Sequence, residues 1–155
     1  MRRRQRGPVP DRALGVLLLP DRLDRMAQRE RADALLRAPG VVAVEPAALG
    51  YGATSRLPEL MRDRIANGQA RRMGLPGHPR AVVAFEAAQY PLARALLALH
   101  PEAELWYGGT GAGELHDAAA ARAALTFTAG DDDDRPLWER MEALGIESGR
   151  LGSER

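Results

Sequence analysis

A glycine-rich segment, residues 106–118 (WYGGTGAGELHDA), carries the pattern with the clearest chemical meaning in this 155-residue chain. Its four glycines follow an apolar run that predicts a strand, and Glu114 marks the expected start of a helix. Glycine lets the backbone approach a ligand closely, and free N–H groups at a helix start attract anions. Tyr107, before the glycines, would either stack on a ring-shaped ligand or close the edge of the sheet, and the sequence leaves both roles open. The candidate ligand-binding residues of this segment are Tyr107, Gly109, Thr110 and Gly111.

The spacing of these glycines differs from that of a dinucleotide site. Such a site has Gly-x-Gly-x-x-Gly after the first strand and an acidic residue roughly 20 positions further on. Here the order is Gly-x-Gly-x-Gly after the fourth predicted strand, and Glu114 would repel an anion. A flexible surface turn that binds no ligand is the alternative interpretation.

Carboxylates follow three other predicted strands, at Asp21, Glu86 and Asp131, and these are further binding candidates. The run of four aspartates that begins at Asp131 offers oxygen ligands for Mg²⁺ or Ca²⁺. Four consecutive side chains cannot all point at one ion, however, and the run is more typical of a solvated cap on the last helix. We therefore expect neither a metal nor a cofactor, and no catalytic residue can be assigned.

The residue types that are missing exclude several reaction classes. The chain has no cysteine, which excludes disulfides, thiolate zinc sites and cysteine nucleophiles. It has no lysine, which excludes Schiff-base chemistry and a phosphate-binding loop of the Gly-Lys-Ser/Thr type. No serine lies in a nucleophile elbow. Of the three histidines only His116 lies near the glycine-rich segment, and a packing role is the favoured interpretation for it.

Charge and hydropathy predict a cytoplasmic protein without a nucleic-acid partner or a membrane span. The net charge is +1, so no overall field favours nucleic acid, although four arginines stand within the first six residues. The apolar run 14–19 is short and is followed by Pro20 rather than by a cleavage site, so it is not a secretion signal. No segment approaches the roughly 18 apolar residues of a membrane span.

Short apolar runs alternate with amphipathic stretches along the chain. Strands are predicted over 13–19, 41–44, 81–85, 103–107 and 125–128, with a sixth short strand around Ile146 as an option. Helices are predicted over 21–38 (capped by Asp21), 57–73, 90–99, from about 114, and over 136–144; residues 47–56 are expected to form a loop.

This alternation predicts an α/β fold, a Rossmann-like three-layer sandwich whose mostly parallel sheet of five or six strands has helices on both faces. One domain is expected over 12–147, between a mobile basic tail (1–11) and a C-terminal tail (148–155). Ligands of such sheets bind at the carboxyl ends of the strands, where all the candidate residues above are placed. The fold does not identify the ligand.

Three segments in order resemble the N-terminal Rossmann-like domain of GT-B class glycosyltransferases of the bacterial, retaining type. They are RADALLRAPGVVAVEP (31–46), AVVAFEAAQYPLARALLALHPEAELWYG (81–108) and ELHDAAAARAALTFTAGDD (114–132). The resemblance covers roughly residues 13–132. It implies a domain that binds a sugar acceptor or another phosphorylated or nucleotide-sugar-related small molecule.

The chain departs from the family pattern at several positions, and these departures argue against catalysis by this chain alone. Pro20 and Asp21 replace the family's first glycine loop, Glu86 falls near the place of a family histidine, and the serine of the turn at 128–131 is missing. The donor-binding second domain and its glutamate motif are missing too. If the chain is an enzyme, the resemblance implies a partial or degenerate glycosyltransferase that needs a partner chain with a second Rossmann-like domain.

Two other functions remain open. One is a non-catalytic α/β interaction domain that forms a homo- or hetero-oligomer through an edge strand or through the last helix, with Leu137, Trp138 and Met141. The other is a receiver-like switch with acidic groups around a metal. Asp21 and Glu86 fit that pattern only loosely, and the lysine that such switches use is missing.

Overall fold

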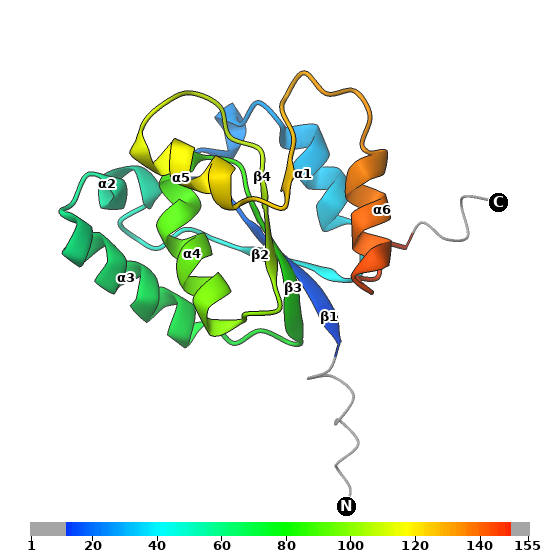
Figure 1. Ribbon diagram of the computed structural model, residues 1–155, viewed down its shortest axis with the longest axis horizontal. Coiled ribbons are helices and arrows are strands. Elements are labelled where there is room, and N and C mark those ends of the chain that lie inside the picture. The colour runs from blue at the N-terminus through cyan, green and yellow to red at the C-terminus, as the bar shows by residue number, and fades with distance from the viewer. Residues whose placement is uncertain (1–11, 150–155) are drawn as a thin grey trace, which may run out of the picture.

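Five parallel strands form the centre of the computed structural model, which describes residues 12–149 (Figure 1). The strands are β1 (Ala13–Leu18), β2 (Val41–Val44), β3 (His78–Ala84), β4 (Glu104–Tyr107) and β5 (Leu125–Thr126). Their order in the sheet is β2-β1-β3-β4-β5, and every neighbouring pair is parallel. The predicted α/β fold with a parallel sheet is confirmed.

Helices cover both faces of the sheet. They are α1 (Arg29–Leu36), α2 (Tyr51–Ser55), α3 (Glu59–Arg72), α4 (Tyr90–Leu99), α5 (Glu114–Arg122) and α6 (Arg135–Ala143), with single 3-10 turns η3 (Leu23–Arg25) and η4 (Ala87–Gln89). Neighbouring side chains of β1 point to opposite faces, so that Leu17 packs with α1 and α6, whereas Val16 and Leu18 pack with α2 to α5. Figure 1 shows the two helical layers on either side of the strands.

The expected helix over 21–38 is wrong in its first turns. Asp21 does not cap it: the two carboxylate oxygens of Asp21 accept hydrogen bonds from the backbone N–H groups of Tyr51 (2.7 Å) and Gly52 (2.8 Å). The chain after β1 forms only the turn η3, and α1 begins at Arg29. The same contacts explain why α2 forms inside the segment 47–56, which was predicted to be a loop.

Ile146 does not form a sixth strand among the described residues. Its side chain is buried beside α1 and α6. Glu147, which follows Ile146, accepts a hydrogen bond at its carbonyl from the backbone N–H of Gly40 (2.8 Å). Arg12 and Gly149 both contact Pro39: the Arg12 guanidinium donates to its carbonyl, and a Cβ on Gly149 would lie 3.0 Å from its Cδ. The predicted basic tail, 1–11, lies outside the described residues.

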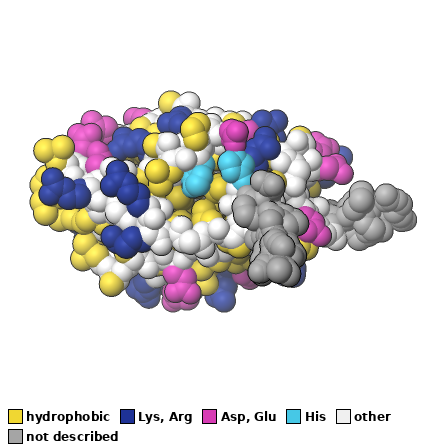
Figure 2. Space-filling model, turned by 90° about the horizontal axis from the view of Figure 1, so that it is seen from below, with side chains coloured by type: hydrophobic (Ala, Val, Ile, Leu, Met, Phe, Trp, Pro, Cys, Tyr) yellow, Lys and Arg dark blue, Asp and Glu magenta, His cyan; other side chains and the backbone are white. Residues whose placement is uncertain are grey.

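The edge formed by the amino ends of the strands faces the viewer in Figure 2. Histidine side chains lie side by side there: the rings of His78 and His100 are 6.4 Å apart, and His78 also bonds to Glu102. Hydrophobic side chains gather at the end of the molecule where α2 and α3 lie. No helix within residues 12–149 is long and apolar enough to cross a bilayer.

The strand order reverses between β1 and β3. The chain leaves β1 for β2 on one side and then returns past β1 to β3, so α1 and α3 cover opposite faces. Their connections separate at the carboxyl ends of these strands, where ligands of open α/β sheets bind.

Candidate functional site

A cleft of about 280 Å³ lies at the carboxyl ends of the strands. Its walls are the segment between η3 and α1, the end of β3, and the glycine-rich loop after β4. We call it the strand-end cleft. The polar residues that line it are Arg25, Gln28, Glu86, Gly108 and Thr110. The structure therefore brings Glu86 and Thr110, both predicted from the sequence, to one site.

An outer hollow of about 450 Å³ continues this cleft between the start of α1 and the loop before α6. The two share Ala27, Gln28 and Ala129. Asp131, Asp132 and Asp134 line the outer hollow, as does Arg31. The predicted residue Asp131 thus lies beside the cleft rather than in it.

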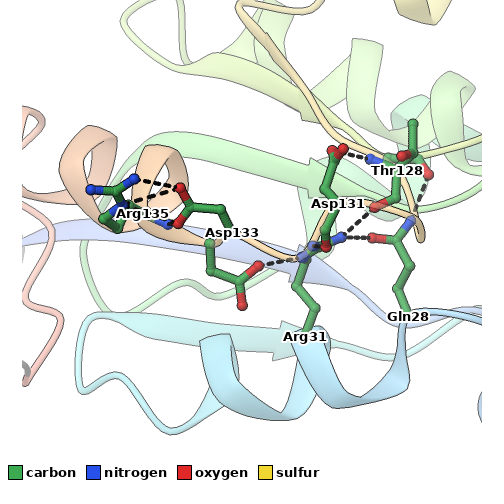
Figure 3. A network of polar contacts seen from close by, with 8 residues as sticks. Gln28, Arg31, Thr128, Asp131, Asp133 and Arg135 are labelled. Atoms are coloured by element: carbon green, nitrogen blue, oxygen red, sulfur yellow. Dashed lines mark hydrogen bonds and ion pairs between the residues drawn. The ribbon is translucent and has the colours of Figure 1, made fainter.

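Arg31 lines the outer hollow and is the centre of a network of polar contacts (Figure 3). Its guanidinium donates to the carbonyl oxygens of Thr128 (2.8 Å) and Asp131 (2.6 Å), to Oδ1 of Asp134 (2.8 Å) and to Oε1 of Gln28. Gln28 in turn donates from Nε2 to the carbonyl of Gly108 (2.7 Å). This network connects α1 to both loops that border the site.

Gln89 fixes the position of Glu86. Its amide oxygen accepts hydrogen bonds from the backbone N–H groups of Phe85 (2.7 Å) and Glu86 (3.2 Å), and its Nε2 donates to the carbonyl of Leu18 (3.0 Å). The Gln89 side chain is completely buried. It therefore ties the ends of β1 and β3 together at the point where the strand order reverses.

Carboxylates at these two strand ends disfavour ionisation of their neighbours. Partial burial, and then the nearby charge of Asp21, raise the pKa of the Glu86 carboxyl. Burial raises the pKa of the Tyr51 phenol, with Asp21 and Glu86 adding to the effect. Burial and then Glu86 raise the pKa of Tyr107. Asp21 thus acts electrostatically near the cleft, although its own oxygens are bonded to α2.

Replacing Glu86 by glutamine is expected to raise the melting temperature at neutral pH, because it removes a carboxylate that is disfavoured in the folded state. A carboxyl pKa that folding raises contributes stability that is present below the unfolded pKa and is lost as the pH rises through the folded pKa. The gain over wild type should be absent at about pH 3 and reach only about 1–2 °C at about pH 7, since the Glu86 side chain is buried only in part and solvent screens its charge.

Circular-dichroism melts of Glu86→Gln and wild type across this pH range would measure the gain. Glu142→Gln, on the exposed face of α6, is the matched control and should leave the melting temperature unchanged. An equal gain at acid and neutral pH would show that ionisation of Glu86 is not the cause.

Tyr107 packs beneath the surface against Gly109 of the glycine-rich loop and does not line the cleft. Its side chain is buried, and its hydroxyl is hydrogen-bonded to Nδ1 of His116 (2.9 Å). Gly109 lies directly against this hydroxyl, with no room for a Cβ. Gly111 has a φ of 108°, a conformation that favours glycine, and lies open to solvent. The loop therefore depends on its glycines for shape, while Thr110 is its exposed residue in the cleft.

Gly108→Ala is expected to destabilise the fold by about 1–3 kcal/mol, the usual cost of overpacking a core. A Cβ at this position would overlap the buried ring of Phe127. Gly130→Ala is the control, because its Cβ would meet only Oγ1 of Thr128, at 3.8 Å, and it should change the free energy of unfolding by less than about 0.5 kcal/mol. Urea unfolding of both variants measures the difference, and equal stabilities would contradict the expectation.

Asp131 and Asp133, two aspartates of the run, make structural contacts. Oδ2 of Asp131 accepts from the N–H of Thr128 (2.8 Å), and Oδ1 of Asp133 accepts from the N–H of Arg135 (3.0 Å) at the start of α6. Within the described residues no three histidine, aspartate or glutamate side chains lie close enough together to hold a metal ion.

Three residues of the site, Gln28, Arg31 and Gln89, were not singled out from the sequence. Gln28 and Arg31 stand three positions apart in a stretch that reads as the polar side of a helix, so no local pattern marks them as buried. Gln89 stands three residues after Glu86, a spacing that is typical of a helix-start capping pair, and this signal would have found it.

The fold and the cleft define an α/β domain with a polar cleft at its strand ends. Comparisons of the chain with models of protein families, with curated proteins and with solved structures return no match.

Proposed function

We propose that the chain is a glycosyltransferase-like N-terminal domain that binds an acceptor or a phosphorylated small molecule in the strand-end cleft and does not transfer sugar alone. The observation that carries the proposal is the convergence of Glu86, Gln28, Thr110 and the backbone of Gly108 on one cavity at the reversal of strand order. Sites of this kind hold small molecules in open parallel sheets.

The groups in the cleft suit a polyhydroxylated ligand. A carboxylate accepts hydrogen bonds, a guanidinium donates them, and a hydroxyl does both, so Glu86, Arg25 and Thr110 together match the alternating donors and acceptors of a sugar. The cleft volume of about 280 Å³ lies near the lower end of small-molecule sites, roughly 300–1,000 Å³. A ligand the size of a monosaccharide, extended into the outer hollow by a second neutral ring, is the expected occupant, because the carboxylates of the outer hollow would repel a phosphate there.

A partner chain with a second Rossmann-like domain would supply donor binding. The family resemblance of 13–132 supports this part of the proposal, because enzymes of that class hold the nucleotide-sugar donor mainly in their second domain. Acceptor-type ligands should therefore bind the isolated chain better than nucleotides do.

Saturation-transfer-difference NMR with simple sugars, sugar phosphates, UDP and GDP tests the proposal. Signals from at least one sugar or sugar phosphate are expected with wild type and should be strongly reduced in Glu86→Gln, because the variant loses an acceptor oxygen in the cleft. Glu142→Gln, on α6, is the control and should bind as wild type does. A folded wild-type chain that gives no signal with any of these compounds would contradict the proposal.

A second function, a non-catalytic interaction domain, is favoured by exposed apolar side chains on α3. Leu60 is 83% exposed and Met61 52%. Figure 2 shows hydrophobic side chains gathered at the end of the molecule where α3 lies. The last helix, which the sequence suggested as an interaction surface, does not offer these side chains to a partner. Leu137 and Met141 are buried, and Trp138 packs on the same core. Light scattering of a Leu60→Asp, Met61→Asp variant separates the two functions: an oligomer that this variant dissociates would favour the interaction domain.

A further inference from the structure

The outward face of α3 combines apolar and basic side chains and has no acidic one. Leu60 is 83% exposed and Met61 52%, and the arginines that follow them on this face are exposed too. Residues three or four positions apart lie on one face of a helix, so positions 60, 64, 67 and 71 form a stripe, with 61, 68 and 72 beside it. We call this face the α3 stripe. It comprises Leu60, Met61, Arg64, Asn67, Gly68, Arg71 and Arg72.

The two acidic residues of α3 lie off the stripe. Asp63 accepts a hydrogen bond from Arg94 of α4 (2.7 Å), on the side of α3 that packs against that helix. Glu59 precedes Leu60 and therefore lies about 100° from it around the helix axis. The stripe thus carries three positive charges and no negative one.

The arginines of the stripe have no acidic neighbour. In the part of the chain that the structure describes, no carboxylate forms an ion pair with Arg64, Arg71 or Arg72. Figure 2 shows basic side chains among the hydrophobic ones at the end of the molecule where α3 lies. A partner of this face must therefore be negatively charged and must also accept apolar side chains.

A negatively charged lipid surface meets both requirements. Arginines are attracted to anionic headgroups, and apolar side chains of a surface helix enter the boundary between headgroups and acyl chains. A side chain that is 83% exposed, as Leu60 is, protrudes from the helix, so a protein partner would need a pocket for it. A second copy of the chain is disfavoured, because a symmetric contact would place the arginines of two stripes against each other.

We propose that the α3 stripe is a peripheral binding surface for membranes that contain anionic lipids. Leu60 and Met61 enter the lipid surface, and the three arginines bind its headgroups, while α3 lies along the membrane and does not cross it. The chemistry follows from exposed apolar side chains beside arginines that no carboxylate neutralises. The proposal does not depend on the sugar-binding function, because the α3 stripe and the strand-end cleft share no residue.

Co-sedimentation of the full-length chain with lipid vesicles tests the proposal. We expect binding to vesicles made of equal parts of phosphatidylglycerol and phosphatidylcholine, little binding to phosphatidylcholine alone, and weaker binding as salt is added. The triple variant Arg64→Gln, Arg71→Gln, Arg72→Gln should weaken binding on the order of 100-fold, because each arginine near an anionic surface contributes about fivefold.

The matched control is the triple variant Arg22→Gln, Arg37→Gln, Arg122→Gln. It loses the same charge from exposed positions outside α3, and it should weaken binding by less than about fivefold because salt screens charges that do not touch the membrane. Both triple variants keep the arginines of residues 1–11, so a difference between them belongs to the α3 stripe.

A third variant, Leu60→Ser, Met61→Ser, should weaken vesicle binding by about tenfold or more, because two apolar side chains no longer enter the membrane. Binding of this variant equal to wild type would overturn the proposal, as would an equal loss in both triple variants. Wild type that does not prefer anionic vesicles would overturn it too. If light scattering shows an oligomer that this variant dissociates, a second copy covers the stripe and the proposal is wrong.

Discussion

Arg31→Ala lowers the free energy of unfolding by about 2–4 kcal/mol, the expected result of removing a buried cation from a paired network. The Arg31 side chain is only 8% exposed, and four of its N–H groups bond to Gln28, Thr128, Asp131 and Asp134. The guanidinium also lies over the ring of Phe127, 5.4 Å from its centroid. Without it, the loop before α6 loses its hydrogen bonds to α1.

Two further variants sharpen this test by urea unfolding. Arg135→Ala removes an ion pair with Asp133 that is largely exposed (78% and 53%), and should cost less than about 0.5 kcal/mol. Arg31→Lys keeps the charge but not the planar fork of donors, so it should lose at least about half of the stability that alanine loses. If Arg31→Ala were as stable as Arg135→Ala, Arg31 would not stabilise the contact between α1 and the loop before α6.

Gln89→Leu is expected to cost about 3–5 kcal/mol, because it removes the partner of three backbone groups, two of them buried and one partly buried. A buried group left unpaired costs roughly 1–3 kcal/mol. The three groups are the N–H groups of Phe85 and Glu86 and the carbonyl of Leu18. The variant should also weaken ligand binding in the strand-end cleft, since Glu86 is no longer held. Urea unfolding and saturation-transfer NMR measure the two effects.

Gln89→Glu tests the hydrogen bond that Gln89 donates separately from the two that it accepts. The carboxylate keeps the acceptor for Phe85 and Glu86 but loses the donor to Leu18, so the variant should be less stable than wild type at neutral pH and recover part of the loss in acid, where a protonated carboxyl donates. Gln69→Leu, at a half-exposed position on α3, is the control and should cost less than about 1 kcal/mol. A Gln89→Leu variant as stable as this control would show that β1 and β3 do not need the amide.

The strands and most helices could be predicted because their signals are local. Runs such as Val41–Val44 are apolar and short, and Pro39-Gly40 before them ends a helix wherever it occurs. The same reasoning placed Glu86 and the glycine-rich loop at one edge of the sheet, because the carboxyl ends of parallel strands meet there.

The contacts that shape the site could not be predicted in this way, because their partners are distant in sequence. Asp21 reads as a cap for the nearest helix, yet it bonds to backbone groups 30 and 31 residues later. No local pattern marks Arg31 as buried, because its partner Asp134 is 103 residues away. For Tyr107 the sequence leaves ligand stacking and packing at the sheet edge open, and only the position of His116 shows that the tyrosine hydroxyl is already hydrogen-bonded.

Arg12 and Gly149 both touch Pro39, at the amino ends of the strands and so opposite the strand-end cleft. A linker of a few residues would therefore join Arg12 to Gly149. A circularly permuted chain with new termini in another loop is expected to keep the sheet order. For the same reason, an affinity tag or a fused domain attached at either position would lie at the edge of the sheet opposite the strand-end cleft. The protein could then be immobilised or labelled through that tag without covering the cleft.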